Sequence, residues 1–247
     1  MTQQNTLHQG NKIRLYLGST LLFIGIFSSA AVAGLLILLS TPFSFSIRYK
    51  VSALWCQLVL WMAKVFCGLT HEVEGLENIE ANQPAIVLSN HQSAWETLAL
   101  RHILPTQVVL LKRSLIWLPI GGWALGTLKS IPIDRKNHRE AMRILLEKGT
   151  AYLNQGFWVI IFPEGTRTAA GKIRKFNAGG ALLAQKSGYP VIPVAHNAGD
   201  YWPRYSFLKY PGNIKVKIGP LIESKGRKAA NINAEVESWI AHAIKEM

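Results

Sequence analysis

The sequence contains few cysteines and few charged residues. Only 2 of its 247 residues are Cys, which excludes a disulfide framework and a four-cysteine zinc site. Charged residues make up 17% of the chain, below the level of about 25% that is usual in soluble domains. No motif recurs at a fixed period, so the chain is not a repeat array. A hydrophobic content of 49% excludes intrinsic disorder, which requires low hydrophobicity.

The charge that is present is mostly basic. There are 27 Lys and Arg against 14 Asp and Glu, a formal net charge of +13. Such an excess calls for an acidic partner, which would be nucleic acid, anionic lipid or a phosphorylated substrate. The sequence has no basic helix and no aromatic stacking motif of the kind that binds nucleic acid. Anionic membrane lipid or a phosphorylated substrate is therefore favoured, and no nucleic acid partner is expected.

A long apolar segment lies near the N-terminus. Residues 15–47 include no charged side chain. As a helix, residues 15–39 would be about 37 Å long, at roughly 1.5 Å per residue, whereas the hydrocarbon core of a bilayer is about 30 Å thick. A signal peptide would have an apolar region of only about 7–15 residues. The length therefore predicts a membrane segment that is retained.

A second apolar stretch covers residues 51–70, of which only 51–63 form an uninterrupted uncharged run. That run is short for a membrane span and suits an interfacial or re-entrant helix. Trp55 and Trp61 are of the type that collects at the level of lipid headgroups. Two arrangements stay open: one true span, or a two-helix hairpin that enters one leaflet.

Residues 1–70 are thus predicted to be a membrane anchor and residues 71–247 an α/β domain. In the second part, short β-rich runs alternate with helical patterns, which predicts a mixed, largely parallel sheet flanked by helices. The alternating pattern of residues 213–219 is typical of an edge strand. The expected strands are 84–90, 107–112, 130–134, 157–162, 189–194 and 213–219, and the expected helices begin near 93, 138, 178 and 233.

Such sheets carry their chemistry in loops beyond the carboxyl ends of the strands, and the first such loop contains His91. On a regular helix, side chains five residues apart diverge by about 140°. His91 and Glu96 can therefore meet only if His91 precedes the helix and folds back over its first turn. A carboxylate placed there would hold the imidazole in one tautomer and raise its basicity. The alternative is a capping box formed by Ser93 and Glu96, which the spacing by itself favours.

The second loop follows the apolar run 157–162. Pro163 ends that strand because it cannot donate to a sheet, and Glu164, Gly165 and Thr166 then offer backbone amides and a hydroxyl. Arg167 follows, and arginine binds phosphate through two parallel hydrogen bonds. These residues predict a phosphate site. The alternative is an ordinary glycine turn in which Glu164 and Arg167 pair on the surface.

Taken together, the two loops resemble the motifs of the glycerolphosphate acyltransferase superfamily. The string FPEGTR and the string NHQS carry the resemblance, which extends from about Val73 to Gly219. The superfamily usually has His-x4-Asp, whereas the acid here is Glu96. Arg135 stands where the second motif ends in arginine, although the Gly and Phe usually found upstream are not clearly present. Pro193 marks the fourth motif, in the run VIPV.

The resemblance implies an enzyme that moves a fatty acyl chain from acyl-CoA or acyl-carrier protein to the sn-2 hydroxyl of lysophosphatidic acid, giving phosphatidic acid. His91 would be the general base and Glu96 would orient it. Arg135 and Arg167, with the loop 164–166, would hold the phosphate of the acceptor. No metal, cofactor or acyl-enzyme is implied.

Between the two loops, residues 114–128 are free of charge and are interrupted by Pro119, Gly121 and Gly122. The segment is too short and too interrupted to cross a bilayer. One hypothesis is that it lines an acyl-chain groove, with Lys112 or Arg113 near the phosphate. The alternative is that it belongs to the ordinary core of the domain.

Two further expectations concern the surroundings of the enzyme. A basic cluster of Lys172, Arg174 and Lys175 is expected to face anionic headgroups or an acidic acyl carrier, the alternative being a solvated surface. The short chain without a recognisable organelle signal favours a bacterial inner membrane, with the active site facing the cytoplasm where acyl donors are.

Two other functions stay open at this point. The acceptor could be another lysolipid, such as lyso-ornithine lipid, although the two arginines favour a phosphate monoester. The protein could also bind phospholipid without catalysis, although a base and an acid beside a phosphate loop favour an enzyme.

Overall fold

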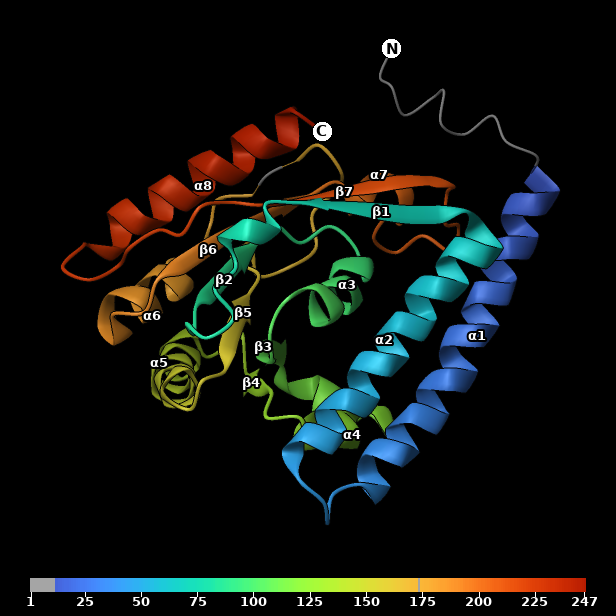
Figure 1. Ribbon diagram of the computed structural model, residues 1–247, viewed down its shortest axis with the longest axis horizontal. Coiled ribbons are helices and arrows are strands. Elements are labelled where there is room, and N and C mark those ends of the chain that lie inside the picture. The colour runs from blue at the N-terminus through green and yellow to red at the C-terminus, as the bar shows by residue number, and fades with distance from the viewer. Residues whose placement is uncertain (1–11, 173) are drawn as a thin grey trace.

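The computed structural model describes residues 12–172 and 174–247, which form a helical hairpin packed against an α/β domain (Figure 1). The domain is built on a seven-stranded sheet in the order β1-β7-β6-β2-β5-β3-β4. All neighbouring strands are parallel except β6 and β7. The predicted mixed, largely parallel sheet is confirmed. Its strands are β1 (Leu69–Glu74), β2 (Ile86–Ser89), β3 (Gln107–Lys112), β4 (Ile131–Ile133), β5 (Trp158–Ile161), β6 (Val191–His196) and β7 (Gly212–Ile218).

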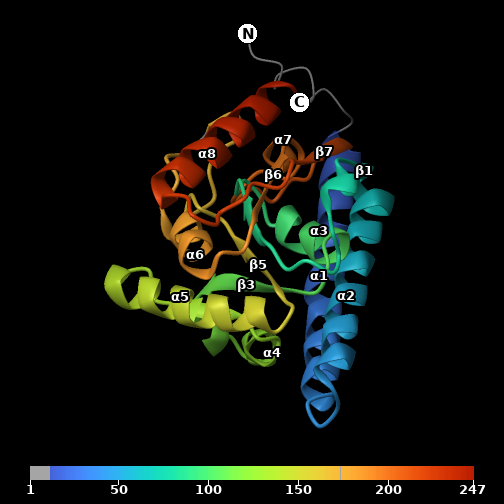
Figure 2. The same ribbon diagram turned by 60° about the vertical axis from the view of Figure 1, so that its left-hand side comes forward.

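The sheet is covered on both faces, with the hairpin and α3 on one side and α5, α6 and α8 on the other (Figure 2). Alternate residues of a strand point to opposite faces. Within β2, Val87 accordingly joins the core on the hairpin side, while Ile86 and Leu88 join the other core. The helices of the domain are α3 (Trp95–Ile103), α4 (Gly121–Thr127), α5 (His138–Asn154), α6 (Gly179–Ser187), α7 (Ala198–Tyr201) and α8 (Ala229–Lys245), with short 3-10 helices at Leu76–Asn78 (η2) and Arg113–Trp117 (η3).

The prediction that residues 213–219 form an edge strand is wrong. Strand β7 lies between β1 and β6, and the edge on that side is β1, which the sequence analysis did not identify. In β7, Ile214, Val216 and Ile218 are buried and the residues between them are partly exposed. One-sided burial produces the same alternation in an inner strand as at an edge, so the pattern could not distinguish the two positions.

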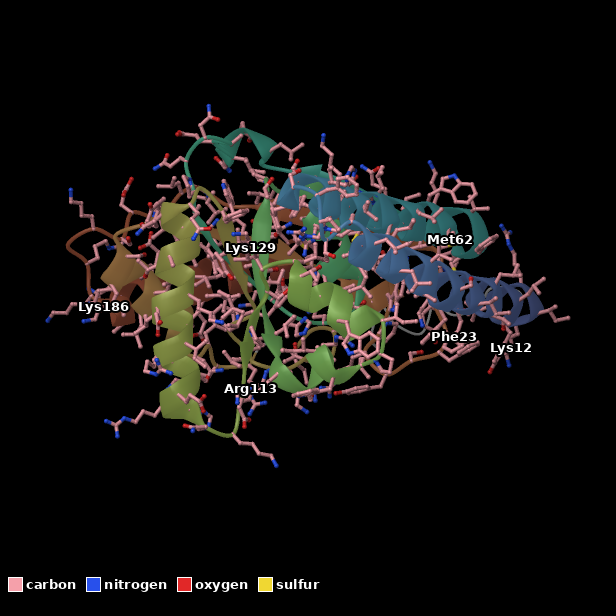
Figure 3. All side chains as sticks on the ribbon, turned by 90° about the horizontal axis from the view of Figure 1, so that it is seen from below. Lys12, Phe23, Met62, Arg113, Lys129 and Lys186 are labelled. Carbon is pink, nitrogen blue, oxygen red and sulfur yellow. The ribbon has the colours of Figure 1, made fainter. Side chains whose placement is uncertain are left out.

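The hairpin consists of α1 (Lys12–Leu39) and α2 (Phe45–Cys67), which pack side by side along the domain. Both are long and apolar enough to cross a membrane by length and composition. Gly18 allows the close approach of the two helices, because a Cβ there would clash with the carbonyl oxygen of Phe66. Lys12, at the start of α1, and Lys186, in α6, lie at opposite ends of the molecule (Figure 3).

The hairpin is also tied to the domain by polar contacts. The hydroxyl of Tyr49 accepts a hydrogen bond from the amide of Gln107, at 3.2 Å. The guanidinium of the buried Arg101 lies 4.7 Å from the centre of the Tyr49 ring. The hairpin and the sheet are therefore held in one orientation by contacts at the start of β3.

Candidate active site

The loop between β2 and α3 brings His91 and Glu96 together. The strand ends at Ser89 and the helix begins at Trp95, so His91 precedes the helix and folds back over its first turn. The Nδ1 atom of His91 lies 2.7 Å from Oε1 of Glu96. With the Nδ1 proton donated to the carboxylate, Nε2 is the nitrogen that can accept a proton.

The same carboxylate oxygen also organises the start of the helix. Oε1 of Glu96 accepts hydrogen bonds from the amides of Gln92 and Ser93, at 3.0 and 2.9 Å. The Ser93 hydroxyl, however, accepts from the amide of Trp95 at 3.1 Å, two residues on, instead of the third residue of a regular capping box. The two interpretations of Glu96 are therefore compatible, since one oxygen serves both the helix start and the imidazole.

Glu96 is completely buried and is held in its ionised form. Burial raises the pKa of this carboxyl, but its interactions with the imidazoles of His196 and His91 and the hydrogen bond from the Ser93 amide outweigh that effect. The pKa consequently lies below its ordinary value. An ionised carboxylate is what an imidazole needs beside it when it takes up a proton.

The second loop is hydrogen-bonded directly to the first. The carbonyl of His91 accepts from the amide and the hydroxyl of Thr168, at 2.7 and 3.2 Å. The amide of His91 donates to Oε1 of Glu164 at 3.4 Å. The His91 ring stacks on Phe162, with ring centres 4.3 Å apart. The structure thus brings the two sequence motifs, separated by some seventy residues, into one site.

Sequence reasoning missed a clamp that fixes the residue before His91. The side chain of Asn90 donates to the carbonyl of His196 at 2.9 Å and accepts from its amide at 3.0 Å. Nε2 of His196 lies 2.9 Å from the carbonyl of Asn90. Burial lowers the pKa of His196, so the ring is neutral and its Nε2–H donates to this carbonyl. The sequence shows a histidine just after the expected strand 189–194, at His196, but no local pattern indicates that it contacts Asn90.

A cavity of about 430 Å³ opens beside this site. Apolar side chains from β3, β4 and α5 line one part of it: Leu110, Ile133, Met142 and Leu145. Basic side chains line another part: Arg135, His138, Arg174 and Lys175. Phe162 and Glu164, which both contact His91, also line the cavity. A pocket with a basic part and an apolar part suits a molecule that has an anionic group and a hydrocarbon chain.

The structure brings four of the predicted phosphate-binding residues to this cavity: Arg135, Glu164, Gly165 and Thr166. Arg135 donates a hydrogen bond to the carbonyl of Gly165. Arg167 is not part of the lining, and its carbonyl accepts a hydrogen bond from Arg204.

Arg174 and Lys175 line the cavity, which Arg167 does not. Both the amide and the side chain of Asn177 donate to the carbonyl of Pro163, at 2.9 and 2.8 Å. These bonds fold the segment that follows Arg167 back over the loop at 163–166. Arg174 and Lys175 are exposed, as expected, and they also line the open cavity.

Four further predicted residues lie away from the cavity. Lys112 is exposed at the end of β3. Gly121 and Gly122 begin α4, which packs against α1, and a Cβ at Gly122 would clash with the carbonyl of Leu115. Pro193 is buried in β6 and packs toward Gly219.

Glu164 has an unusual electrostatic environment for a carboxyl. It is 2% exposed, and its Oε2 atom has no hydrogen-bond partner among the described residues. Burial raises its pKa to about 7; the side chain of Thr168 and the amide of His91 oppose this increase, Glu96 adds a smaller increase, and Arg174 a smaller decrease. No group of three or more His, Cys, Asp or Glu in the described part of the chain is arranged to hold a metal ion.

Comparison with known proteins agrees with this geometry. Residues 70–197 match the acyltransferase family. The chain is 42% identical, over 93% of its length, to a 1-acyl-sn-glycerol-3-phosphate acyltransferase of Pseudomonas aeruginosa, 91% of which is covered. It is 31% identical to the mouse 1-acyl-sn-glycerol-3-phosphate acyltransferase alpha, over 74% of this chain and 65% of that one.

The fold has a counterpart among solved structures. The 1-acyl-sn-glycerophosphate (LPA) acyltransferase of Thermotoga maritima superposes with a TM-score of 0.80, over 95% of this chain and 96% of that chain. At 24% identity this likeness concerns the fold, including the hairpin. The family match and the 42% identity to the Pseudomonas protein carry the assignment further: the chain belongs to the acyltransferase family.

Proposed function

We propose that this protein transfers a fatty acyl chain from a thioester to the sn-2 hydroxyl of lysophosphatidic acid, giving phosphatidic acid. The observation that carries the proposal is the 2.7 Å pair of His91 and buried Glu96 beside a cavity with a basic part and an apolar part. The bacterial and mouse relatives are named for the same activity.

The reaction follows from the orientation of the imidazole. Nε2 of His91 takes the proton of the acceptor hydroxyl as the hydroxyl oxygen attacks the thioester carbonyl, and Glu96 stabilises the imidazolium that forms. Collapse of the tetrahedral intermediate breaks the carbon–sulfur bond, and the proton passes from His91 to the departing thiolate. The donor is acyl-CoA or acyl-carrier protein, and the same step applies to both because both carry the acyl chain as a thioester.

The direct test is acyl transfer by the purified protein in liposomes, with product measured by mass spectrometry. Lysophosphatidic acid, lysophosphatidylcholine and lyso-ornithine lipid serve as competing acceptors. Turnover restricted to lysophosphatidic acid supports the proposal. Turnover only with lyso-ornithine lipid would keep the chemistry and overturn the acceptor. Lipid binding without turnover, unchanged in His91→Ala, would favour the non-catalytic alternative.

The basic part of the cavity is proposed to hold the phosphate of the acceptor. We expect Arg174→Ala to raise the KM for lysophosphatidic acid by about 10- to 100-fold, because a hydrogen bond to a charged group contributes about 1.5–3 kcal/mol. The turnover number should change less, since His91 stays in place. Initial rates against acceptor concentration measure both constants.

Two matched variants make this measurement specific. Lys172→Ala removes an exposed charge from the same segment without touching the cavity, and its KM should stay within about twofold of wild type. Arg167→Ala tests the residue that the sequence motif favours. An increase in KM for Arg167→Ala but not for Arg174→Ala would contradict the assignment of Arg174.

The apolar part of the cavity, lined by Leu110, Met142 and Leu145, is proposed to take hydrocarbon chain. The segment with Gly121 and Gly122, suggested by the sequence for this role, lies against α1 instead. Its exposed side chains Trp117 and Trp123 are then proposed to contact lipid, since tryptophan favours the membrane interface.

The hairpin is proposed to lie within one leaflet instead of crossing the bilayer. Lys50, Gln57 and Lys64 are exposed at intervals of seven residues and so follow one line along α2, where Gln57 also contacts His102 of α3 at 2.8 Å. Leu54 and Trp61 are exposed beside this line. Lys50 and Lys64 are separated by about 21 Å along the helix, less than the hydrocarbon thickness of about 30 Å. A crossing helix would place polar groups in hydrocarbon, whereas a helix in the membrane plane keeps all three at headgroup level.

Cysteine labelling in oriented vesicles tests this placement. In one leaflet, Ser44→Cys in the hairpin turn should react with an impermeant maleimide from the same side as Lys225→Cys in the domain. Both positions are exposed, and the native Cys56 and Cys67 are buried. Labelling of Ser44→Cys from the opposite side would show that the helices cross the membrane. We place the domain on the cytoplasmic side, where acyl donors are.

A further inference from the structure

We propose that Glu164 is a neutral carboxylic acid in the substrate complex and donates a hydrogen bond from Oε2 to the phosphate of the acceptor. Binding of the phosphate is then linked to one proton on the protein. This inference rests on the proposed function, because it concerns the group that the cavity holds.

The geometry leaves Oε2 of Glu164 without a partner inside the protein. Oε1 accepts a hydrogen bond from the amide of His91, but Oε2 is buried and has no hydrogen-bond partner among the described residues. An ionised carboxylate with an unsatisfied oxygen is costly to bury. Glu164 also lines the cavity, so a group bound there lies beside this residue.

The charged groups around Glu164 come from every element packed against the cavity. The ionised Glu96 repels a negative charge on Glu164, whereas Arg174 attracts it. Glu164 also interacts with His91 of the β2–α3 loop and with Thr168 of its own loop. The other titratable groups that line the same cavity are Lys175 before α6, Arg135 beyond β4 and His138 of α5. Burial, which raises the pKa of Glu164 to about 7, is the largest influence.

A phosphate monoester makes the protonation state of Glu164 decisive. The phosphate carries about −1.5 to −2 charges at pH 7, and Glu164 is the one acidic side chain among the described residues that line the cavity. In its ionised form Glu164 would repel the phosphate. In its neutral form it would instead donate an O–H···O⁻ hydrogen bond, which is stronger than a bond between neutral groups. The proton stays on Glu164 during the reaction and is taken from solvent when the lipid binds above pH 7.

The variant Glu164→Gln separates these two forms. Glutamine keeps an oxygen that accepts from the His91 amide and adds an N–H donor where the carboxylic proton would be, but it does not ionise. We expect the KM of wild type, divided by that of Glu164→Gln, to be constant below pH 7 and to rise about tenfold per pH unit above it. The ionisation of the lipid phosphate cancels in this ratio. A ratio that stays constant between pH 6 and pH 9 would overturn the proposal.

A second measurement does not depend on the identity of the substrate. The pKa of Glu164 in the folded protein lies above its unfolded value, so its stabilising effect is full below about pH 4.5 and is lost as the pH rises to about 7. Glu164→Gln should therefore have a higher Tm than wild type at pH 8, and the difference should shrink toward pH 5. A Tm difference independent of pH would overturn the neutral state of Glu164.

The two readouts distinguish this inference from the proposed function. If neither wild type nor Glu164→Gln turns over lysophosphatidic acid but the Tm difference depends on pH as expected, the proposed acceptor is wrong and the neutral state of Glu164 stands. The KM ratio is then measured with the lysolipid that is turned over. A flat ratio with a phosphate-bearing acceptor contradicts the hydrogen bond from Glu164 to phosphate.

Discussion

Replacing His91 with alanine is expected to lower kcat by about 10²- to 10⁴-fold, the range that a positioned general base contributes. Its Nδ1 is committed to Glu96, which leaves Nε2 as the nitrogen that accepts the hydroxyl proton. Arg135, Arg174 and the phosphate loop stay in place in this variant, so the KM for lysophosphatidic acid should change much less than kcat. Steady-state rates over both substrates separate the two constants.

A surface histidine provides the control for this variant. His242 lies on α8 with its side chain 75% exposed, remote from the cavity lining, and His242→Ala should retain the wild-type kcat. A thermal melt shows whether His91→Ala remains folded. If folded His91→Ala keeps kcat within about tenfold of wild type, His91 is not the base, because a lost base costs more than this.

Replacing Glu96 with glutamine is expected to lower kcat by about 10²-fold or more, because the imidazolium loses its ionised partner. The amide oxygen of glutamine can still accept from the amides of Gln92 and Ser93, so the start of α3 should be preserved. The variant therefore separates the two roles of the same oxygen. Rates and melting temperature, measured together, show which role is lost.

Glu96→Asp is the companion variant. Aspartate keeps the charge but is shorter by one methylene, so it should retain more activity than Glu96→Gln while losing some stability. Full activity in Glu96→Gln would mean that Glu96 only organises the helix start. The opposite order of activities, with Gln above Asp, would show that reach matters more than charge at this position.

The central strands were predictable because their signal is local. Residues 158–161 are apolar without alternation, and all four are buried in β5 between two layers of helices. The residues of β2 are likewise apolar or small and all buried. Helix α5 was predictable from apolar side chains at helical spacing, which end before Gly156. The strand end and the helix start left two interpretations of His91 and Glu96 open, and the resemblance of the two loops to the acyltransferase motifs favoured the catalytic pair.

The lining of the cavity was not predictable in the same way. Arg167 follows the glycine turn directly, so the motif favours it for phosphate. Arg174 is brought to the cavity by the hydrogen bonds of Asn177 to Pro163 and by the position of α6. Such contacts join residues more than ten positions apart, and no local pattern records them. The same reason explains why the clamp between Asn90 and His196 was missed.

The sequence alone determined the two apolar N-terminal segments, the alternation of strands and helices, and the two loops that contain His91, Glu96 and the string FPEGTR. These depend on the periodicity of side chains and on residues with special backbone geometry, which act over a few positions. The tertiary structure decided that β7 is an inner strand, that Arg174 and Lys175 face the cavity, and that Glu164 is buried with one oxygen unpaired. Each of these depends on the packing of one segment against another that is distant in the chain. That packing decides which side chains are exposed and which protonation state a buried carboxyl prefers.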